Sequence, residues 1–569
     1  MTRLIILGLA GALALAGFSH VTLAKGSVAP ITPAVETAKQ AELAAIRVHD
    51  SSATWLDAGA AASANIAGDT KAAPSPDAVL NASIGDRRGD MDGHFNAGFA
   101  GRVTAPFDIG SDLNDQAFGV LATDGDFSLM IGRAGSLTNG TRLALSWHRA
   151  DGALATERLA LGKQTLDVTW ASNTQLSLIK AVGVQGTVGS VYLFRFYILG
   201  QLEFTATSDG DIDFAVMCLR YGGGGMFEPC PDFGSLGNGM VRVGFDMGQP
   251  NFRKDVPYDL FLDQGNQCLL LAGTAQLTTS DYDFAITRLN LFSGALDTGF
   301  AGSGKRTVFF DLGSTPVDEA MAIHVRPIDN KIVVAGRANL GLFSFRSAMA
   351  QLDWDGVQDP GFCAPAVSSC ESPASHRSGR RLWDDDVGIV FSQVTSLLGG
   401  GIAPNDTIVV REQVPSASSG RGRVSRVAVD GGCSVCTDAW LQNFERIRPL
   451  TALTDFRFTP PFFFDFGVVV AGYGLYSTSD DSHTHVFRVR SDMTLDDSFT
   501  SGPVPVQQFY DFAAAAGEPA VSRPAAMTRD SRGRYLIAGS RRWNASNNDW
   551  DFALARLQHD VILATGFDY

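Results

Sequence analysis

The chain has little positive charge for its size. Its 569 residues hold 45 Lys and Arg against 60 Asp and Glu, which gives a formal net charge of −15. A nucleic-acid-binding surface needs a basic stripe, and adhesion to an anionic membrane needs a basic patch. We therefore expect no nucleic-acid partner and no electrostatic attachment to a membrane. The simplest effect of the negative charge is solubility.

Long apolar runs are scarce too. Arg3 precedes an apolar run from Leu4 to Ala16, and Thr22 and Ala24 are the small residues that follow it. A basic start, a short apolar core and small residues before a cleavage point predict a signal peptide over residues 1–24. A membrane anchor needs about 20 apolar residues, and no cysteine follows the run to carry a lipid. We expect a secreted or periplasmic protein with no membrane span.

Residues 25–93 are rich in Ala, Ser, Asp and Gly, and we expect a low-complexity, flexible spacer there. A short helix is conceivable over Ala34–Arg47. The tripeptide Arg88-Gly-Asp90 matches an adhesion motif, but such matches are common by chance. The folded part is then expected over residues 94–569.

Cysteine is sparse as well, with seven residues in the whole chain. Local disulfides are the usual use of cysteine in an oxidising compartment, and an odd number leaves at least one residue out of the local pairs. Cys433-Ser-Val-Cys436 could instead be a redox pair or half of a metal site. We expect two local disulfides, Cys363–Cys370 and Cys433–Cys436. The spacing also allows Cys218 and Cys230 to pair, which would leave Cys268 as a buried thiol.

Against these absences stands a repeat of roughly 65 residues. An Asp-Phe-Ala segment begins at Asp213, Asp283 and Asp551. An apolar run closed by glycine recurs out of phase with it, and in one degenerate copy arginine replaces the glycine. The seven copies are Leu129–Gly132, Tyr197–Gly200, Leu269–Gly273, Ile332–Gly336, Ile408–Arg411, Val468–Gly472 and Tyr535–Gly539.

The repeats predict an all-β ring. Each apolar run is short and apolar on both faces, as in a strand covered on both sides, and Gly, Asn or Asp turns precede most runs. The first repeat begins at His94 without an Asp-Phe-Ala strand, whereas the chain ends with one at Asp551–Leu557. We therefore predict a seven-bladed β-propeller over residues 94–569, closed by strands from both termini. In this prediction Asp551–Leu557 completes the blade begun by residues 94–132. An open solenoid is the alternative architecture.

These motifs resemble a known family. The best copy runs from Asp283 to Gly336 and carries Asp-Phe-Ala-x-x-Arg-Leu, Gly-x-Gly-Lys and Asp-x-Lys-Ile-Val-Val-Ala-Gly. The pattern is similar to the delta-60 repeat of bacterial secreted and surface proteins, over about residues 94–569. The resemblance implies a β-propeller-like fold. It implies no general activity and assigns no site residue.

Motifs that carry chemistry are mostly lacking. There is no Gly-x-Ser-x-Gly, no His-Glu-x-x-His and no phosphate loop. His483-Thr-His485 could hold a metal, but a polar loop is favoured because no third ligand stands nearby. Trp383 opens an acidic segment that we interpret as a solvated turn, and Asp90-Met-Asp92-Gly93 is a weaker acidic motif.

One acidic segment, Asp209-Gly-Asp211-Ile-Asp213, looks like a calcium loop. The pairs Asp281-Tyr-Asp283 and Asp549-Trp-Asp551 occupy the same place in their repeats, so a turn at the start of a strand is the favoured explanation. We predict no catalytic residue, no cofactor-binding residue, no metal ligand and no cofactor.

Two functions remain. The first is an exported, monomeric binding or scaffold propeller, with a protein or carbohydrate ligand on its loop-rich faces. The second is an extracytoplasmic hydrolase or lyase with a site at the central channel, which would need converging titratable residues at one mouth. Because the sequence shows no such cluster, the binding role is favoured.

Overall fold

The computed structural model describes residues 90–558 with internal gaps at 97–100, 110–112, 138–139, 171–172, 206–209, 247–253, 313–315, 342–343, 365–378, 384–388, 397–405, 417–418, 442–445, 460–462, 476–481, 501–506, 513–519 and 545–548. The expected signal peptide, the spacer with its Ala34–Arg47 helix, and Arg88 lie outside the described residues. Across those that are described, no helix is long and apolar enough to cross a membrane.

The described chain is all-β, as predicted, with two 3-10 turns, η3 (Asp124–Asp126) and η4 (Ala160–Gly162), and no α-helix. Five sheets follow in chain order. They are β2 (Asp115–Thr123), β3 (Phe127–Leu137), β4 (Gly140–His148) and β5 (Lys163–Thr169); β6 (Thr174–Val188), β7 (Val191–Phe204), β8 (Asp211–Tyr221), β9 (Phe227–Pro229) and β10 (Met240–Val243); β11 (Val256–Asp263), β12 (Cys268–Thr278), β13 (Asp281–Asn290) and β14 (Lys305–Val308); β15 (Asp318–Arg326), β16 (Lys331–Gly341), β17 (Ser344–Leu352) and β18 (Arg380–Leu382); β19 (Ile389–Ser396), β20 (Thr407–Ser416), β21 (Ser419–Val427) and β22 (Cys433–Leu441).

The sixth sheet has eight strands and contains both ends of the described chain. Its halves are joined by a single bridge between Ser482 and Val521. One half holds β23 (Arg446–Thr459), β24 (Phe463–Leu475), β25 (Ser482–Arg490) and β26 (Gln507–Tyr510); the other holds β27 (Val521–Arg529), β28 (Tyr535–Asn544), β29 (Asp549–Leu557) and β1 (Arg102–Ala105).

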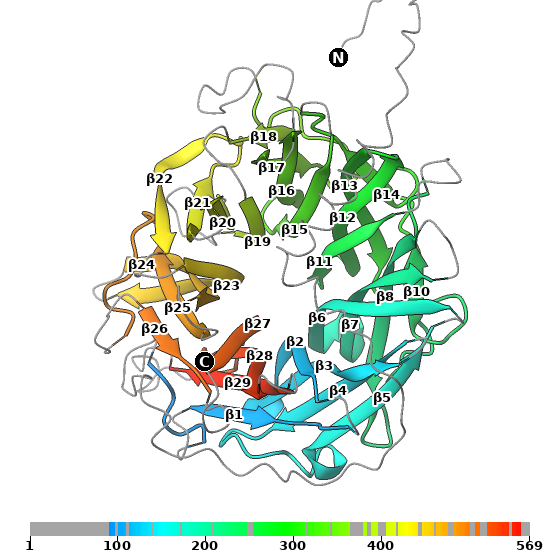
Figure 1. Cartoon of the computed structure of the whole chain (residues 1–569), viewed down its shortest axis with the longest axis vertical. Coiled ribbons are helices and arrows are strands. Elements are labelled where there is room, and N and C mark those ends of the chain that lie inside the picture. The colour runs from blue at the N-terminus through cyan, green and yellow to red at the C-terminus, as the bar shows by residue number, and fades with distance from the viewer. Residues whose placement is uncertain are drawn as a thin grey trace, which may run out of the picture.

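We call each set of four successive strands a quartet, with β9 as an extra strand beside β8. Figure 1 shows the quartets arranged in a ring, with the first strand of each nearest the centre and the fourth at the periphery. The arrangement is propeller-like. Hydrogen bonding defines six sheets, because two quartets share the eight-stranded sheet.

The apolar-Gly runs all lie in the second strand of a quartet, paired on both sides, as their two-sided apolar pattern predicted. The glycine has a steric cause. A Cβ built on Gly336 would lie 1.8 Å from the carbonyl oxygen of Glu319, where a β-bulge in the first strand comes closest. Gly273 and Gly539 face the same kind of bulge, at 2.2 and 2.0 Å. Glycine therefore allows the bulged strand to approach its neighbour.

The two ends of the chain meet in β29. This strand pairs with β28 on one side and with β1 on the other, and all nine of its residues are buried. Met91 forms a further bridge to Leu557. One detail of the prediction is wrong: residues 94–132 do not form one blade with β29. Only β1 joins it, because the chain then crosses to β2 and starts the next sheet.

An ion pair recurs near the end of the third strand, between an arginine of that strand and an aspartate outside it. Arg288 pairs with Asp297 at 2.8 Å, and Arg556 pairs with Asp92 at 2.7 Å. The backbone N–H of each aspartate donates to the carbonyl of its arginine. In the β6–β10 quartet the same backbone bond joins Cys230 to Cys218, and the disulfide that the spacing allows between them is present. A covalent link there replaces the ion pair.

The other cysteines are partly described. Cys268 is a free, buried thiol, as expected once Cys218 and Cys230 pair. Cys363 is disulfide-bonded, and its expected partner, Cys370, lies outside the described residues. Cys433 and Cys436 both lie on β22, but their side chains are not described, so that pairing stays a prediction.

Candidate metal centres between neighbouring quartets

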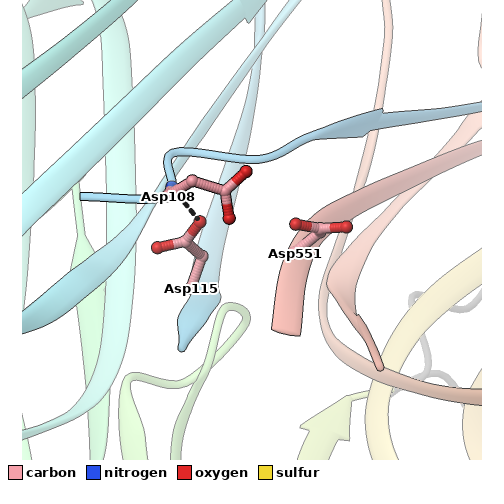
Figure 2. Close-up of side chains that lie close together, drawn as sticks. All are labelled: Asp108, Asp115 and Asp551. Carbon is pink, nitrogen blue, oxygen red and sulfur yellow. Dashed lines mark hydrogen bonds between the residues drawn. The ribbon is translucent and has the colours of Figure 1, made fainter. Parts of the chain in front are cut away.

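Three acidic clusters lie between neighbouring quartets of the described chain. In each cluster, one carboxylate oxygen per residue lies within 4.8 Å of the others. Figure 2 shows Asp551 on β29 facing Asp108, in the crossover between β1 and β2, and Asp115, at the start of β2. The three clusters are Asp108, Asp115 and Asp551; Asp213, Asp246 and Asp255; and Asp281, Asp283 and Asp311.

The clusters share one local design. The fourth strand is followed by a Phe-Asp pair whose aspartate has a left-handed backbone, with φ of 50° at Asp311. Aspartate tolerates that conformation better than most residues. The chain then turns into the next first strand, where one Asp318 oxygen accepts the backbone N–H groups of Phe310, at 2.5 Å, and Asp311, at 3.3 Å. Asp115 makes the same two bonds in Figure 2's cluster, to Phe107 and Asp108.

Burial governs the protonation of these carboxyl groups. Desolvation, together with the neighbouring charges of Asp281 and Asp311, raises the pKa of Asp283 to about 7. Desolvation likewise raises the pKa of Asp255 to about 7, against two backbone N–H groups that lower it. It raises the pKa of Asp213 to about 6, although Arg242 opposes the shift.

Two clusters contain an arginine. The Arg541 guanidinium lies 2.9 Å from an Asp551 oxygen, and Arg242 forms a close ion pair with Asp213. Arg242 is paired across the sheet with the residue two positions after Asp213. In the third cluster the residue two positions after Asp283 is paired with Thr307, so Thr307 is equivalent to Arg242. Asp283 itself is paired with Ala275, just as Asp551 is paired with Arg541. The arginines of the other two clusters therefore have no counterpart around Asp283.

Every quartet whose second strand has a glycine at the bulge has a position equivalent to that of Asp283. This position lies on the third strand, two residues before the residue that pairs with the glycine; for Asp283 that pair is Gly273 and Ala285. Two quartets carry arginine there, Arg142 and Arg346. Another carries His483, whose Nδ1 lies 3.2 Å from a carboxylate oxygen of Asp511. The fold therefore accepts acidic, basic or imidazole side chains at this place, and an aspartate is not a requirement of the strand.

Several sequence predictions can now be placed. The strands β8, β13 and β29 begin at Asp211, Asp281 and Asp549, so these motifs do start strands. The preference for a polar loop at His483-Thr-His485 is wrong, because both histidines lie inside β25 and His485 is buried. Strand pairing with β24 places them there.

Trp383 is buried beside two arginines: the Arg381 guanidinium lies 4.5 Å from the ring centroid and that of Arg411 lies 5.0 Å away. It does not lie in a solvated turn, and the acids that follow it lie outside the described residues. Asp92, from the weakest acidic motif, is buried in the ion pair with Arg556.

The missed residues are the aspartates of the fourth-strand crossover. Their signal in the sequence is the recurrence of Phe-Asp at Phe107, Phe245 and Phe310, followed each time by an apolar residue and glycine. The sequence led us to predict no metal ligand. The convergence of these aspartates with the Asp-x-Asp motifs is a reason to revise that prediction.

Comparisons with known proteins add little. No protein-family model and no curated protein matches the chain. Among solved structures, an ulvan lyase bound to a sugar fragment aligns with 79% of this chain and 96% of its own, at 9% identity and a TM-score of 0.35. An α-L-arabinofuranosidase from Lactobacillus brevis aligns with 53% of this chain and 89% of its own, at 12% identity and a TM-score of 0.26. Likenesses this weak indicate neither an activity nor a substrate.

Proposed function

We propose that the chain is an exported, seven-bladed β-propeller that acts as a binding or scaffold module. Each quartet is one blade, and the eight-stranded sheet counts as two. Residues 1–24 are the signal peptide, 25–93 the spacer, and 94–569 the propeller. The pairing of β29 with β1 supports closure by the two ends of the chain. The disulfide between Cys218 and Cys230 is consistent with an extracytoplasmic location.

One observation carries the binding role: the three acidic clusters recur at one edge of the ring. Each lies where a third strand begins and where the chain crosses from a fourth strand to the next first strand. Asp246 and Asp311 are exposed, whereas Asp213 and Asp283 behind them are buried. An edge with accessible carboxylates on a rigid frame suits ligands that present cationic or hydroxyl groups. A basic protein segment or a carbohydrate has that chemistry.

The hydrolase or lyase role has one observation in its favour. Two carboxyl groups of a single cluster, Asp213 and Asp255, have pKa values raised to about 6 and about 7, which is common at acid–base sites. Burial argues against it. Asp255 is fully buried, and one of its oxygens accepts backbone N–H groups from Phe245 and Asp246. A group enclosed in this way has no path to a polymeric substrate.

A paired experiment tests the proposal. The exported protein is screened for binding to glycan and peptide arrays and for turnover of polysaccharides, as wild type and as Asp246→Asn and Asp311→Asn. We expect binding without turnover, weakened by either substitution. The control is Asp355→Asn, which removes an exposed carboxylate from the turn after β17, at the opposite end of a third strand from the clusters. Turnover that disappears in Asp213→Asn or Asp255→Asn would establish the enzyme instead. If neither Asp246→Asn nor Asp311→Asn weakens binding on the arrays, the ligand does not bind at the edge of the ring that carries the acidic clusters.

A further inference from the structure

The third acidic cluster differs from the other two in its charge balance. From this difference we infer that Asp281, Asp283 and Asp311 bind a hard divalent cation of the calcium class, held between the β11–β14 and β15–β18 quartets. The inference goes beyond the proposed ligand-binding role and does not depend on it.

The spacing of the oxygens fits such an ion. Calcium binds oxygen ligands at 2.3–2.6 Å, so two ligands of one ion are at most about 5 Å apart. The three carboxylates of this cluster offer oxygens within 4.8 Å of one another. Magnesium, with ligands at about 2.1 Å, holds its oxygens within about 4.2 Å of one another and so fits the upper end of this spacing less well.

The Asp283 carboxylate points to a missing partner. Asp283 is only 2% exposed, and its Oδ1 is buried with no hydrogen-bond partner in the part of the chain that is described. Asp318, at 0% exposure, has an Oδ1 in the same condition, and so do Asp115, Asp213 and Asp255 in the other clusters, which differ from this one in having an arginine. Buried polar atoms are nearly always satisfied, and a buried carboxylate needs a counter-charge. A cation among these oxygens would supply both.

The groups that face the cluster leave a surplus of negative charge. Asp318 begins β15 and adds a fourth carboxyl group beside the cluster, where it accepts the backbone N–H of Asp311 at 3.3 Å. Among the described residues, Arg380 of β18 is a basic group whose charge interacts with Asp311 and Asp318, and its Nη1 donates to the carbonyl of Phe309 at 2.5 Å. Within that part of the chain, carboxyl groups therefore outnumber the basic groups that interact with them.

The other clusters serve as internal controls. Arg242 and Arg541 supply a built-in cation to Asp213 and Asp551. At the equivalent positions around Asp283 stand Thr307 and Ala275, which carry no charge. An external ion at this cluster therefore takes the role that an arginine has in its two relatives.

A bound ion would also join two quartets. The backbone N–H of Tyr282, between the two β13 ligands, donates to the carbonyl of Pro316 at 2.9 Å, and Tyr282 forms a bridge with Val317. The cluster thus spans a contact that already exists, and ion binding should stiffen it. We expect the free protein to melt at a lower temperature than the calcium-bound protein.

The test is calcium binding by the full exported protein after treatment with a chelator, followed by titration calorimetry and by thermal unfolding. We expect one calcium ion per chain and a melting temperature that rises with calcium concentration. Asp283→Asn should weaken binding by tenfold or more, whereas the matched control Asp213→Asn should leave it unchanged. Magnesium should bind more weakly than calcium.

A second variant keeps the inference testable if Asp283→Asn does not fold. Thr307→Arg places at this cluster an arginine equivalent to Arg242 of the Asp213 cluster. The variant should not bind calcium, and its melting temperature, unlike that of the wild type, should not change with calcium concentration. No calcium binding by the wild type, or equal binding by wild type, Asp283→Asn and Thr307→Arg, would overturn the inference. These results are separate from the array results, since a protein can bind its ligand without calcium or bind calcium without a ligand.

Discussion

Closure of the ring by β29 yields the largest expected effect of a single perturbation. Leu554 is fully buried in an apolar cluster that includes Phe95, Val103 and Leu536, so it joins both ends of the chain. Replacing a buried leucine with alanine costs about 2–5 kcal/mol, depending on how far the surroundings collapse. We expect Leu554→Ala to fall in this range, with Leu236→Ala, at 83% exposure, as a control near zero.

Removal of the whole strand should be much more severe. A chain that ends at residue 548 loses four large buried side chains, Trp550, Phe552, Leu554 and Leu557. At about 1.5–3 kcal/mol each, their burial contributes roughly 6–12 kcal/mol, which is comparable to the entire stability of a typical domain. It would also leave β28 and β1 with exposed edges that can pair with other chains.

Thermal and urea unfolding, together with light scattering, measure both effects. The truncated chain should be unfolded or aggregated at ambient temperature. Loss of only Asp568 and Tyr569 should matter far less. If the chain lacking residues 549–569 melts like the full-length protein, or if Leu554→Ala behaves like Leu236→Ala, the ring is not closed by β29 and the reasoning fails.

Three further predictions concern other parts of the ring. Burial lowers the pKa of His148 from 6.5 to about 4, so the folded state keeps the ring neutral while the unfolded chain takes up a proton. Its stabilising effect is complete above pH 6.5 and declines as the pH falls towards 4. Urea unfolding should therefore show about 2 kcal/mol less stability at pH 5 than at pH 7 from this group, and His148→Gln should lack that part of the loss. Gly336→Ala should destabilise by about 1–3 kcal/mol or more, because its Cβ would lie 1.8 Å from a backbone oxygen, whereas Gly265→Ala, in an open turn, should be nearly neutral in the same assay. Peptide mapping without reduction should recover Cys433 bonded to Cys436, and free thiols at both would reject that pairing.

The fold was largely predictable because its signals are local and repeated. The run Ile332–Gly336 reveals a strand covered on both sides from five residues, and its repetition reveals the architecture. The glycine requirement has a less local cause, since the bulge that crowds Gly336 lies in the preceding strand. Strand closure was inferred from an offset between the two ends of the chain, but only β1 of the predicted first blade joins β29, because the chain then crosses to β2 and starts the next sheet.

The acidic clusters were not predictable in the same way. Each Asp-x-Asp motif looked like a turn because its third carboxylate comes from another segment, and in one cluster Asp551 and Asp108 come from opposite ends of the chain. Only the ring brings these segments together. That Thr307 and Ala275 stand where the other two clusters have arginine depends on strand register, which the spacing of residues does not reveal.

The most direct test of the account is to locate the ion. Crystals of the full exported protein grown with calcium and exchanged into terbium should give an anomalous difference peak among Asp281, Asp283 and Asp311. No comparable peak is expected at the arginine-containing clusters around Asp213 and Asp551. A peak of equal height at all three clusters, or no peak among Asp281, Asp283 and Asp311, would contradict the charge argument on which the account rests.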